Sequence, residues 1–310
     1  MKTLLMAITL IAAVASCSAA ETVATTVAAE YPYICSGALR DAVLADLADG
    51  TVAQCEGITV TQKDLEALID TSPASTLEEV RKFPIYALEQ YLTKRLILIE
   101  ANEWAKAKGE KDSTDDQLVQ KYLDSKTPKF EVSDKEAEEF YNEHVGMSAF
   151  GGLPYEQIKG AVAYVVREQR ISDARDQLTG SAGKRHKIVV SASWMRAEHE
   201  RWAKNPVEQA RLSGKPTYVN FGVNGCCDHM NPVTQALQLE YGDKLNVVFV
   251  HVGEQAILGE LYGINTIPIQ LLFDKNGKLL VRHVGNLTKE QVLAKFAEGG
   301  VDLSKGNKND

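Results

Sequence analysis

Short apolar runs alternate with amphipathic segments over the C-terminal part of the sequence. The runs TYVNFG and LNVVFVHV predict strands, and MNPVTQALQLEYG and EQAILGELYG predict helices that each end in glycine. The runs IPIQLLFD and KLLVRHVG flank an Asn-Gly pair, which is a strong hairpin signal. TKEQVLAKFAEGG, with Thr288 as N-cap, predicts a last helix. The predicted order is β-α-β-α-β-β-α.

The pattern from residue 35 to about residue 185 is helical instead. One predicted helix carries apolar side chains at spacings of three and four: Leu88, Leu92, Leu96 and Ile99. Pro84 should begin or kink this helix, and Gly109 should end it. Ser133, with Glu136 three residues later, predicts a capping box for another helix. The run KRHKIVVS predicts a short closing strand.

These patterns predict an α+β protein of two domains, a mostly helical N-terminal domain followed by an α/β domain. The predicted segments are a signal peptide (1–20), a linker (21–34), a helical domain (35–190), a connecting helix (191–205), an α/β domain (206–303) and a tail (304–310). Trp194 and Trp202 in the connecting region are candidates for docking the two domains together.

Composition and charge restrict the class of protein. The chain has 310 residues, 45% of them hydrophobic and 25% charged, which is typical of a globular protein. The formal net charge is −8, and no long Lys/Arg run occurs. This charge argues against a general nucleic-acid binder.

The N-terminus predicts export. Met1-Lys2 precedes the apolar run TLLMAITLIAAVA and the small residues SCSAA, a secretory signal that is too short for a stable spanning helix. Cleavage after Ala20 is one expectation. The sequence VASC also resembles a bacterial lipobox, in which case Cys17 would carry lipid and tether a periplasmic lipoprotein to a membrane. The alternative is that Cys17 is a small apolar residue of the signal.

Export permits disulfides, so the remaining cysteines matter. Cys35 and Cys55 bracket a short segment, and a bridge between them would contribute about 3 kcal/mol on the loop-entropy model. Two unrelated free thiols are the alternative. Cys226 and Cys227 are adjacent and are left for each other or for a partner.

The helical region resembles the N-terminal region of the SurA/PpiC-type periplasmic chaperone and isomerase family over about residues 55–190. The resemblance rests on GITVTQKDLEALI, LTKRLILIEANEWAKAKG and VSDKEAEEFYNEH. The sequence has no room for the parvulin catalytic domain of that family. The resemblance therefore implies polypeptide binding or scaffolding, without isomerase activity, and a helical spacer is the alternative.

About residues 205–302 resemble a thioredoxin domain. GKPTYVNFG is similar to its entry strand, and YGINTIPIQLLFDKNGKLLVRHVG is similar to its second half. The resemblance implies a thioredoxin fold with a central mixed sheet. It also implies that the Ile267-Pro268 bond is cis and faces the reactive cysteines, where it would present backbone groups to an extended peptide.

The cysteine pair stands where thioredoxins carry C-x-x-C. Cys227 precedes Pro232 by five residues and Cys226 follows Gly222 by four, so CC resembles a C-x-x-C motif from which two residues are deleted. This register makes Cys226 the nucleophile and Cys227 the resolving thiol. Other registers pair Cys226 with His229, or make Cys227 the nucleophile. Adjacent Cα atoms lie about 3.8 Å apart, closer than the roughly 4.4–6.8 Å of ordinary disulfides, so a bond between the pair would be strained and easily reduced.

Other positions depart from the thioredoxin pattern. Asn220 stands where the family usually has a buried acid, and Phe249 stands where a lysine is common. His229 is a candidate substitute acid–base group, because the unperturbed pKa of histidine is near 6.5. A surface histidine with no role is the alternative.

We therefore expect thiol–disulfide exchange or redox sensing on polypeptide clients, with an unidentified redox partner and no cofactor. An oxidoreductase with an atypical CC motif is one form of this expectation. A peptide-binding protein without catalysis is the main alternative. A site for a soft metal ion, built from Cys226, Cys227, His229 and Met230, is a further one.

Overall fold

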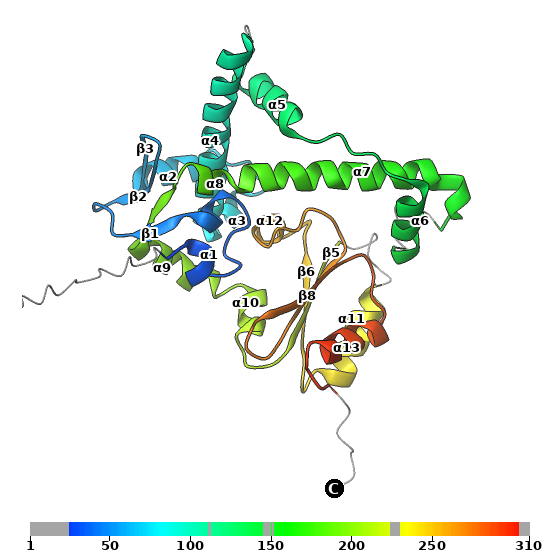
Figure 1. The fold of residues 1–310 in the computed structure, drawn as a ribbon. Helices are drawn as coiled ribbons and strands as arrows, with labels where there is room; N and C mark the ends of the chain where they lie inside the picture. The colour runs from blue at the N-terminus through cyan, green and yellow to red at the C-terminus, as the bar shows by residue number, and fades with distance from the viewer. Residues whose placement is uncertain (1–24, 111–112, 145–149, 151, 224–229, 304–310) are drawn as a thin grey trace, which may run out of the picture.

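The computed structural model describes residues 25–110, 113–144, 150, 152–223 and 230–303. Within these residues the chain forms two four-stranded sheets and many helices (Figure 1). We call residues 25–205 the N-terminal part and residues 206–303 the C-terminal part. Cys17 and the predicted signal lie outside the described residues.

The first sheet belongs to the N-terminal part, for which the sequence predicted a mostly helical domain with one short closing strand. Its strands are β1 (Val43–Ala45), β2 (Thr51–Cys55), β3 (Ile58–Thr61) and β4 (Val189–Ser191). The order is β1-β4-β2-β3, with β1 and β4 parallel and the other pairs antiparallel. Only β4 was predicted. Strands of three to five residues are too short to show a clear alternation, which explains the omission.

The N-terminal part contains two helices at the predicted signals and further helices for which no signal was identified. They are α2 (Gln62–Asp70), α3 (Leu77–Lys82), α4 (Pro84–Lys108), α5 (Asp115–Lys126), α6 (Asp134–Glu143), α7 (Tyr155–Gly180) and α8 (Ala182–Arg185). Pro84 begins α4, and Gly109 ends it with a positive φ of 71°. Ser133 and Glu136 form the predicted capping box of α6. In Figure 1, α4 and α7 are the two longest helices and cross near α8.

The described end of the predicted linker is part of the core. Thr26 bridges to Val43, and α1 (Val27–Glu30) follows it. Val27 and Ile34 are fully or almost fully buried. The short 3₁₀ helix η1 (Ala38–Asp41) then leads into β1. Residues 25–34 are therefore not a linker, because their apolar side chains pack inside the N-terminal part.

Two helices lie around the predicted connecting segment 191–205, the first inside it and the second directly after it. They are α9 (Ala192–Trp202) and α10 (Pro206–Arg211). The break occurs because Asn205 caps α10 through its side chain and Pro206 occupies the first turn. Trp202 is 1% exposed and its ring lies 5.6 Å from that of Phe83 and 5.0 Å from that of Tyr262. It joins the two parts, as the sequence predicted.

The second sheet forms the C-terminal part and has the predicted order of elements. Its strands are β5 (Thr217–Gly222), β6 (Asn246–His251), β7 (Ile269–Phe273) and β8 (Leu279–Val284), and its helices are α11 (Met230–Tyr241), α12 (Ala256–Leu261) and α13 (Lys289–Glu298). The strand order is β6-β5-β7-β8; β5 and β6 are parallel, and the other two pairs are antiparallel. Thr288 caps α13 as predicted.

The second sheet is buried on both faces. One face contributes Tyr218 and Leu272 to a cluster with side chains of α11 and α13. The other face contributes Val219 and Phe221 to a larger cluster that extends through the N-terminal part.

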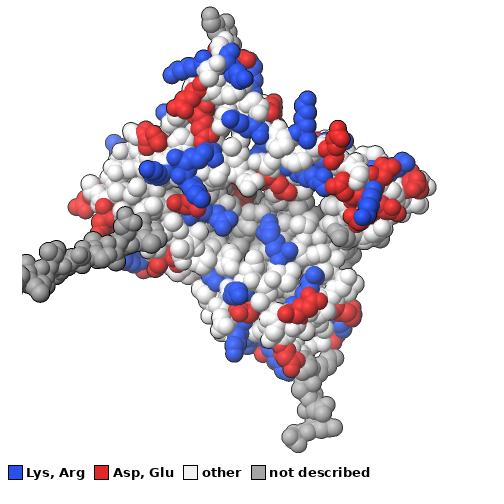
Figure 2. Space-filling model, viewed as in Figure 1, with Lys and Arg blue, Asp and Glu red and all other residues white. Residues whose placement is uncertain are grey.

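On the surface, Lys/Arg and Asp/Glu side chains are interspersed over the face seen in Figure 2. In the described part of the chain, no helix combines the length and apolar character needed to cross a membrane.

Candidate functional site

The loop before β7 carries the backbone feature that the thioredoxin resemblance implies. The Ile267-Pro268 peptide bond is cis. The carbonyl of Pro268 accepts a hydrogen bond of 2.9 Å from the backbone N–H of Gly285, just after β8. Gly285 has a φ of +95°, a conformation that favours glycine. Pro268 is thus held at the end of the sheet where the inner strand β7 begins and the edge strand β8 ends.

The predicted reactive residues follow β5 in the sequence. Cys226, Cys227 and His229 fall between Gly222, where β5 ends, and Met230, where α11 begins, and they lie outside the described residues. The side chain of Met230 is likewise not described. The roles of Cys226 and Cys227, and the alternative metal site, therefore remain predictions. In the described part of the chain, no three His, Cys, Asp or Glu residues gather as a metal site would require.

A buried pair of amides occupies the middle of the second sheet. Asn220 on β5 is fully buried, opposite Phe249 on β6 and Gln270 on β7. Gln270 Nε2 donates to Asn220 Oδ1 over 3.4 Å. Among the described residues, Asn220 Nδ2 and Gln270 Oε1 have no partner. Neither amide can take up a proton at neutral pH, so this pair cannot replace a buried acid.

Sequence reasoning found Asn220 but missed Gln270. A glutamine inside the apolar run IPIQLLF was the available signal, because a polar residue in a buried strand needs a partner. The pairing register of β5 and β7, which only the structure gives, identifies that partner.

Cys35 and Cys55 are both free thiols. The structure therefore has two separate thiols in place of the disulfide bridge considered from the sequence. The Cys55 thiol donates to the carbonyl of His186 over 3.1 Å, and burial raises its pKa to about 11. Burial also raises the pKa of Cys35 well above its usual range. Thiols with raised pKa values are poor nucleophiles at neutral pH, so neither has the character of a reactive cysteine.

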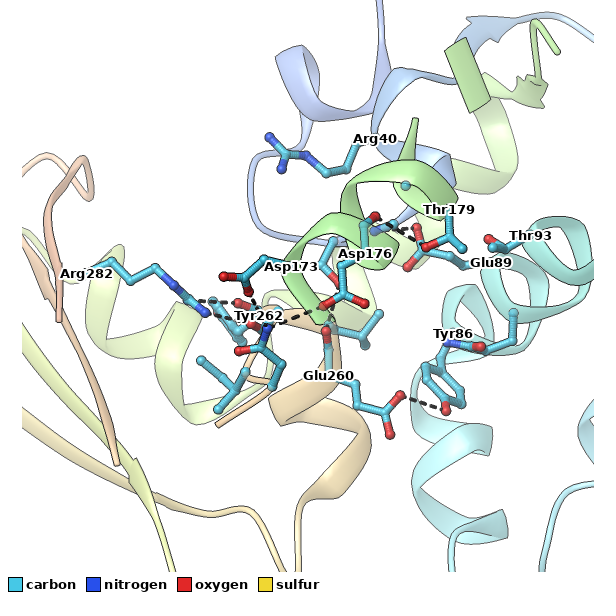
Figure 3. Close-up of a pocket in the computed structure, with 18 residues that line it drawn as sticks. Arg40, Tyr86, Glu89, Thr93, Asp173, Asp176, Thr179, Glu260, Tyr262 and Arg282 are labelled. Carbon is cyan, nitrogen blue, oxygen red and sulfur yellow. Dashed lines mark hydrogen bonds between the residues drawn. The ribbon is translucent and has the colours of Figure 1, made fainter. Parts of the chain in front are cut away.

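A cavity of about 710 Å³ lies between the two parts (Figure 3). Its charged lining residues are Arg40, Glu89, Asp173, Asp176, Glu260 and Arg282. Tyr86 donates to Glu260 over 2.9 Å, and Asn265, three residues before Pro268, donates to Asp176 over 3.3 Å. The Asn265 contact ties the loop that leads to Pro268 to helix α7, and the Tyr86 contact ties α12 to α4.

Glu89 on α4 is the buried acid of this cavity wall. Its Oε1 accepts hydrogen bonds from the backbone N–H groups of Gly37 (2.9 Å) and Leu39 (3.1 Å). Burial nevertheless raises its pKa to about 7. Its backbone partners indicate a structural role in holding the turn before η1.

Comparison with known proteins matches part of the chain to thioredoxins. No family model matches the chain. A thioredoxin of Acidithiobacillus ferridurans is 37% identical over 84 residues, which are 26% of this chain and 77% of that protein. A thioredoxin of Alicyclobacillus acidocaldarius is 32% identical over 93 residues, 29% of this chain and 88% of that protein. The chain belongs to the thioredoxin family.

The thioredoxin homology covers roughly a quarter to a third of the chain. Among solved structures, the thioredoxin NaTrxh of Nicotiana alata is similar with 27% identity, covering 32% of this chain and 84% of that chain at a TM-score of 0.28. The resemblance of residues 55–190 to SurA/PpiC-type proteins is matched by no family model and stays a prediction.

Proposed function

We propose that this protein carries out thiol–disulfide exchange on polypeptide clients through its thioredoxin-like C-terminal part. The proposal rests chiefly on one observation, the arrangement of the second sheet in the order β6-β5-β7-β8, whose β5–α11 connection contains Cys226 and Cys227 in sequence. The homology to proteins named thioredoxin supports it.

The residues have distinct roles in this proposal. The Cys226 thiolate attacks a client disulfide and forms a mixed disulfide. Cys227 resolves it, and Pro268 orients the extended client strand by its backbone. The start of a helix favours a thiolate because unpaired N–H groups and the helix dipole stabilise the anion.

The N-terminal part holds the client in this proposal. Leu153 and Tyr164, before and on α7, are 45% and 58% exposed and offer apolar contacts to a client. Export, and a lipid anchor at Cys17, would place this activity in a periplasm, where client disulfides form.

Trapping of mixed disulfides tests the proposal. The C227S variant should accumulate covalent adducts with disulfide-containing polypeptides, because the resolving thiol is gone while Cys226 remains. The C226S variant is the matched control and should accumulate none, and wild-type protein should reduce insulin. Absence of adducts in C227S, together with no insulin reduction, would overturn the exchange function.

A binding platform without catalysis is the second candidate. The buried pair Asn220 and Gln270 favours it, because neither side chain can relay a proton. Client binding that is unchanged in the C226S/C227S double variant, with no exchange in wild type, would support this function. Native mass spectrometry of reduced protein tests the metal alternative, which predicts a bound soft metal ion that is lost in the same double variant.

A further inference from the structure

The cavity between the two parts is built from segments that are far apart in the sequence. Helices α4 and α7, with η1 and the turn before it, supply one wall, and the end of α12, the loop after it and β8 supply the other. Ser36 Oγ donates to the carbonyl of Glu260 over 2.8 Å, and Tyr86 donates to the Glu260 carboxylate over 2.9 Å. These contacts join the two walls around the cavity.

The size and place of the cavity suit a ligand that is larger than a single ion. Its volume of about 710 Å³ is typical of ligand pockets, which occur preferentially where domains meet. The lining residue Asn265 precedes Pro268 by three residues, which span at most about 11 Å of chain. A polypeptide that passes Pro268 can therefore extend into the cavity.

Three exposed carboxylates of the lining are held by neutral donors. Asp173 and Asp176 project from α7 toward the loop after α12 (Figure 3). Asp173 accepts a hydrogen bond from Gln169 Nε2 over 2.8 Å, and Asp176 accepts one from Asn265 Nδ2 over 3.3 Å. Glu260 accepts from a tyrosine hydroxyl. Amide and hydroxyl donors satisfy the lone pairs of these oxygens but do not neutralise their charge.

Two guanidinium groups of the lining offset part of this negative charge. Arg282 on β8 donates to two backbone carbonyls and is attracted electrostatically by Asp173. Arg40 on η1 is exposed and attracts the buried carboxyl of Glu89. The lining thus has four carboxyl groups against two guanidinium groups. Burial raises the pKa of Glu89 to about 7, and an excess of negative charge remains when this group is protonated.

We propose that this cavity binds a basic side chain, lysine or arginine, of a polypeptide client whose chain also passes Pro268. The inference rests on the proposed exchange function and names the class of client for it. The cationic group of the client lies near Asp173 and Asp176, and its aliphatic stem contacts the apolar lining residue Ile264. Opposite charges then meet where the cavity carries its negative excess.

Fluorescence anisotropy with labelled peptides measures this binding. The probe is a short fluorescein-labelled peptide of alternating alanine and lysine, and the matched neutral probe has glutamine in place of lysine. Reduced wild-type protein should bind the lysine peptide about tenfold more tightly than the glutamine peptide. Added salt should reduce this preference, because it screens the charges.

Removal of the α7 charges should weaken binding of the lysine peptide. D173N/D176N keeps oxygen atoms that accept the same hydrogen bonds and removes two negative charges. Its affinity for the lysine peptide should fall about tenfold, while its affinity for the glutamine peptide stays as in wild type. E156Q/E168Q is the matched control, because both glutamates are exposed on the same helix outside the cavity lining. It should bind both peptides as wild type does.

Removal of a positive charge separates the charge effect from damage to the fold. R40Q reduces repulsion of the ligand, so it should strengthen binding of the lysine peptide by about twofold, whereas a damaged cavity would bind more weakly. Equal affinities of wild type, D173N/D176N and R40Q for the lysine peptide would overturn the inference. If the free diamine putrescine binds as tightly as the lysine peptide, the cavity is a site for small amines and the polypeptide ligand is wrong.

The two proposals can fail separately. If C227S traps lysine-rich and glutamine-rich disulfide peptides equally fast, with and without D173N/D176N, the cavity has no such role and the exchange function stands. If the lysine peptide binds with the expected effects of D173N/D176N and R40Q but C227S traps no client, the exchange function fails and the binding site stands.

Discussion

The two faces of the second sheet are covered in different ways. On one face, Tyr218 and Leu272 pack against Leu237 of α11 and Phe296 of α13, all within the C-terminal part. The other face packs against α12 and also against residues far away in the sequence. Tyr33 meets Phe273 edge-on at 5.6 Å between ring centroids, and Trp202 lies beside Tyr262.

Polar contacts likewise occur both between the two parts and within the C-terminal part. The Glu79 carboxylate accepts hydrogen bonds from the backbone N–H groups of Ile257 (3.0 Å) and Leu258 (2.9 Å), at the start of α12. In the C-terminal part, Arg211 and Tyr262 both bind the buried carboxylate of Glu208. The thioredoxin-like part therefore does not complete its own core. The N-terminal part supplies the missing layer, so the two parts should fold as one unit.

Removal of Trp202 should have the largest effect on this shared core. W202A deletes a buried aromatic side chain that contacts both parts, and such deletions cost about 3–5 kcal/mol. Guanidinium denaturation followed by circular dichroism should show one transition at lower denaturant. W194A, at a half-buried tryptophan of the same helix, should cost much less.

Two separated transitions in W202A would contradict the shared core. In that case the C-terminal part would unfold at its wild-type midpoint while only the N-terminal part shifts. A single shifted transition would show that one face of the sheet depends on the N-terminal part.

The pH dependence of stability should report on Glu89, beside the cavity between the parts. Burial raises its pKa from 4.5 to about 7, so the folded state binds this proton more tightly than the unfolded state. Stability from this group is present below about pH 4.5 and is lost as the pH rises through about 7. The shift corresponds to about 3 kcal/mol at most. E89Q, which cannot ionise, should flatten the stability curve over this range.

A second buried acid, Glu198 on α9, acts in the same direction. Burial raises its pKa to about 7, against the opposing effect of Arg201. Some dependence of the unfolding free energy on pH should therefore remain in E89Q. E78Q, at an exposed glutamate, is the matched control and should leave the slope as in wild type. If the unfolding free energy of E89Q depends on pH as steeply as that of wild type, Glu89 is not a buried group that binds a proton on folding.

Much of the C-terminal part was predictable from the sequence. The run TYVNFG coincides with β5, because a strand that is buried on both faces is mostly apolar over six consecutive residues. The Asn-Gly pair lies in the turn between β7 and β8, where Gly277 has a φ of +76°. Strong local signals of this kind need no tertiary information.

The rest depends on contacts between distant segments. Strands β1 to β3 are too short to give a clear pattern. Residues 25–34 pack into the N-terminal part because Val27 and Ile34 are buried in its core. The close approach of the His144 ring to Gly285 has no local sequence signal, because the two residues are far apart in the chain. The predicted site residues Asn220 and Pro268 were placed by a family resemblance, and position in the fold alone revealed Gln270.

A redox titration of Cys226 and Cys227 tests the central claim most directly. Wild-type protein is equilibrated in glutathione buffers of stepped potential, and the free thiols are counted by mass after alkylation. The account predicts a reversible two-electron transition in peptides that contain this pair, absent from C226S and from C227S. Thiols that remain reduced and unpaired across the whole range, with no transition, would contradict thiol–disulfide exchange at this site.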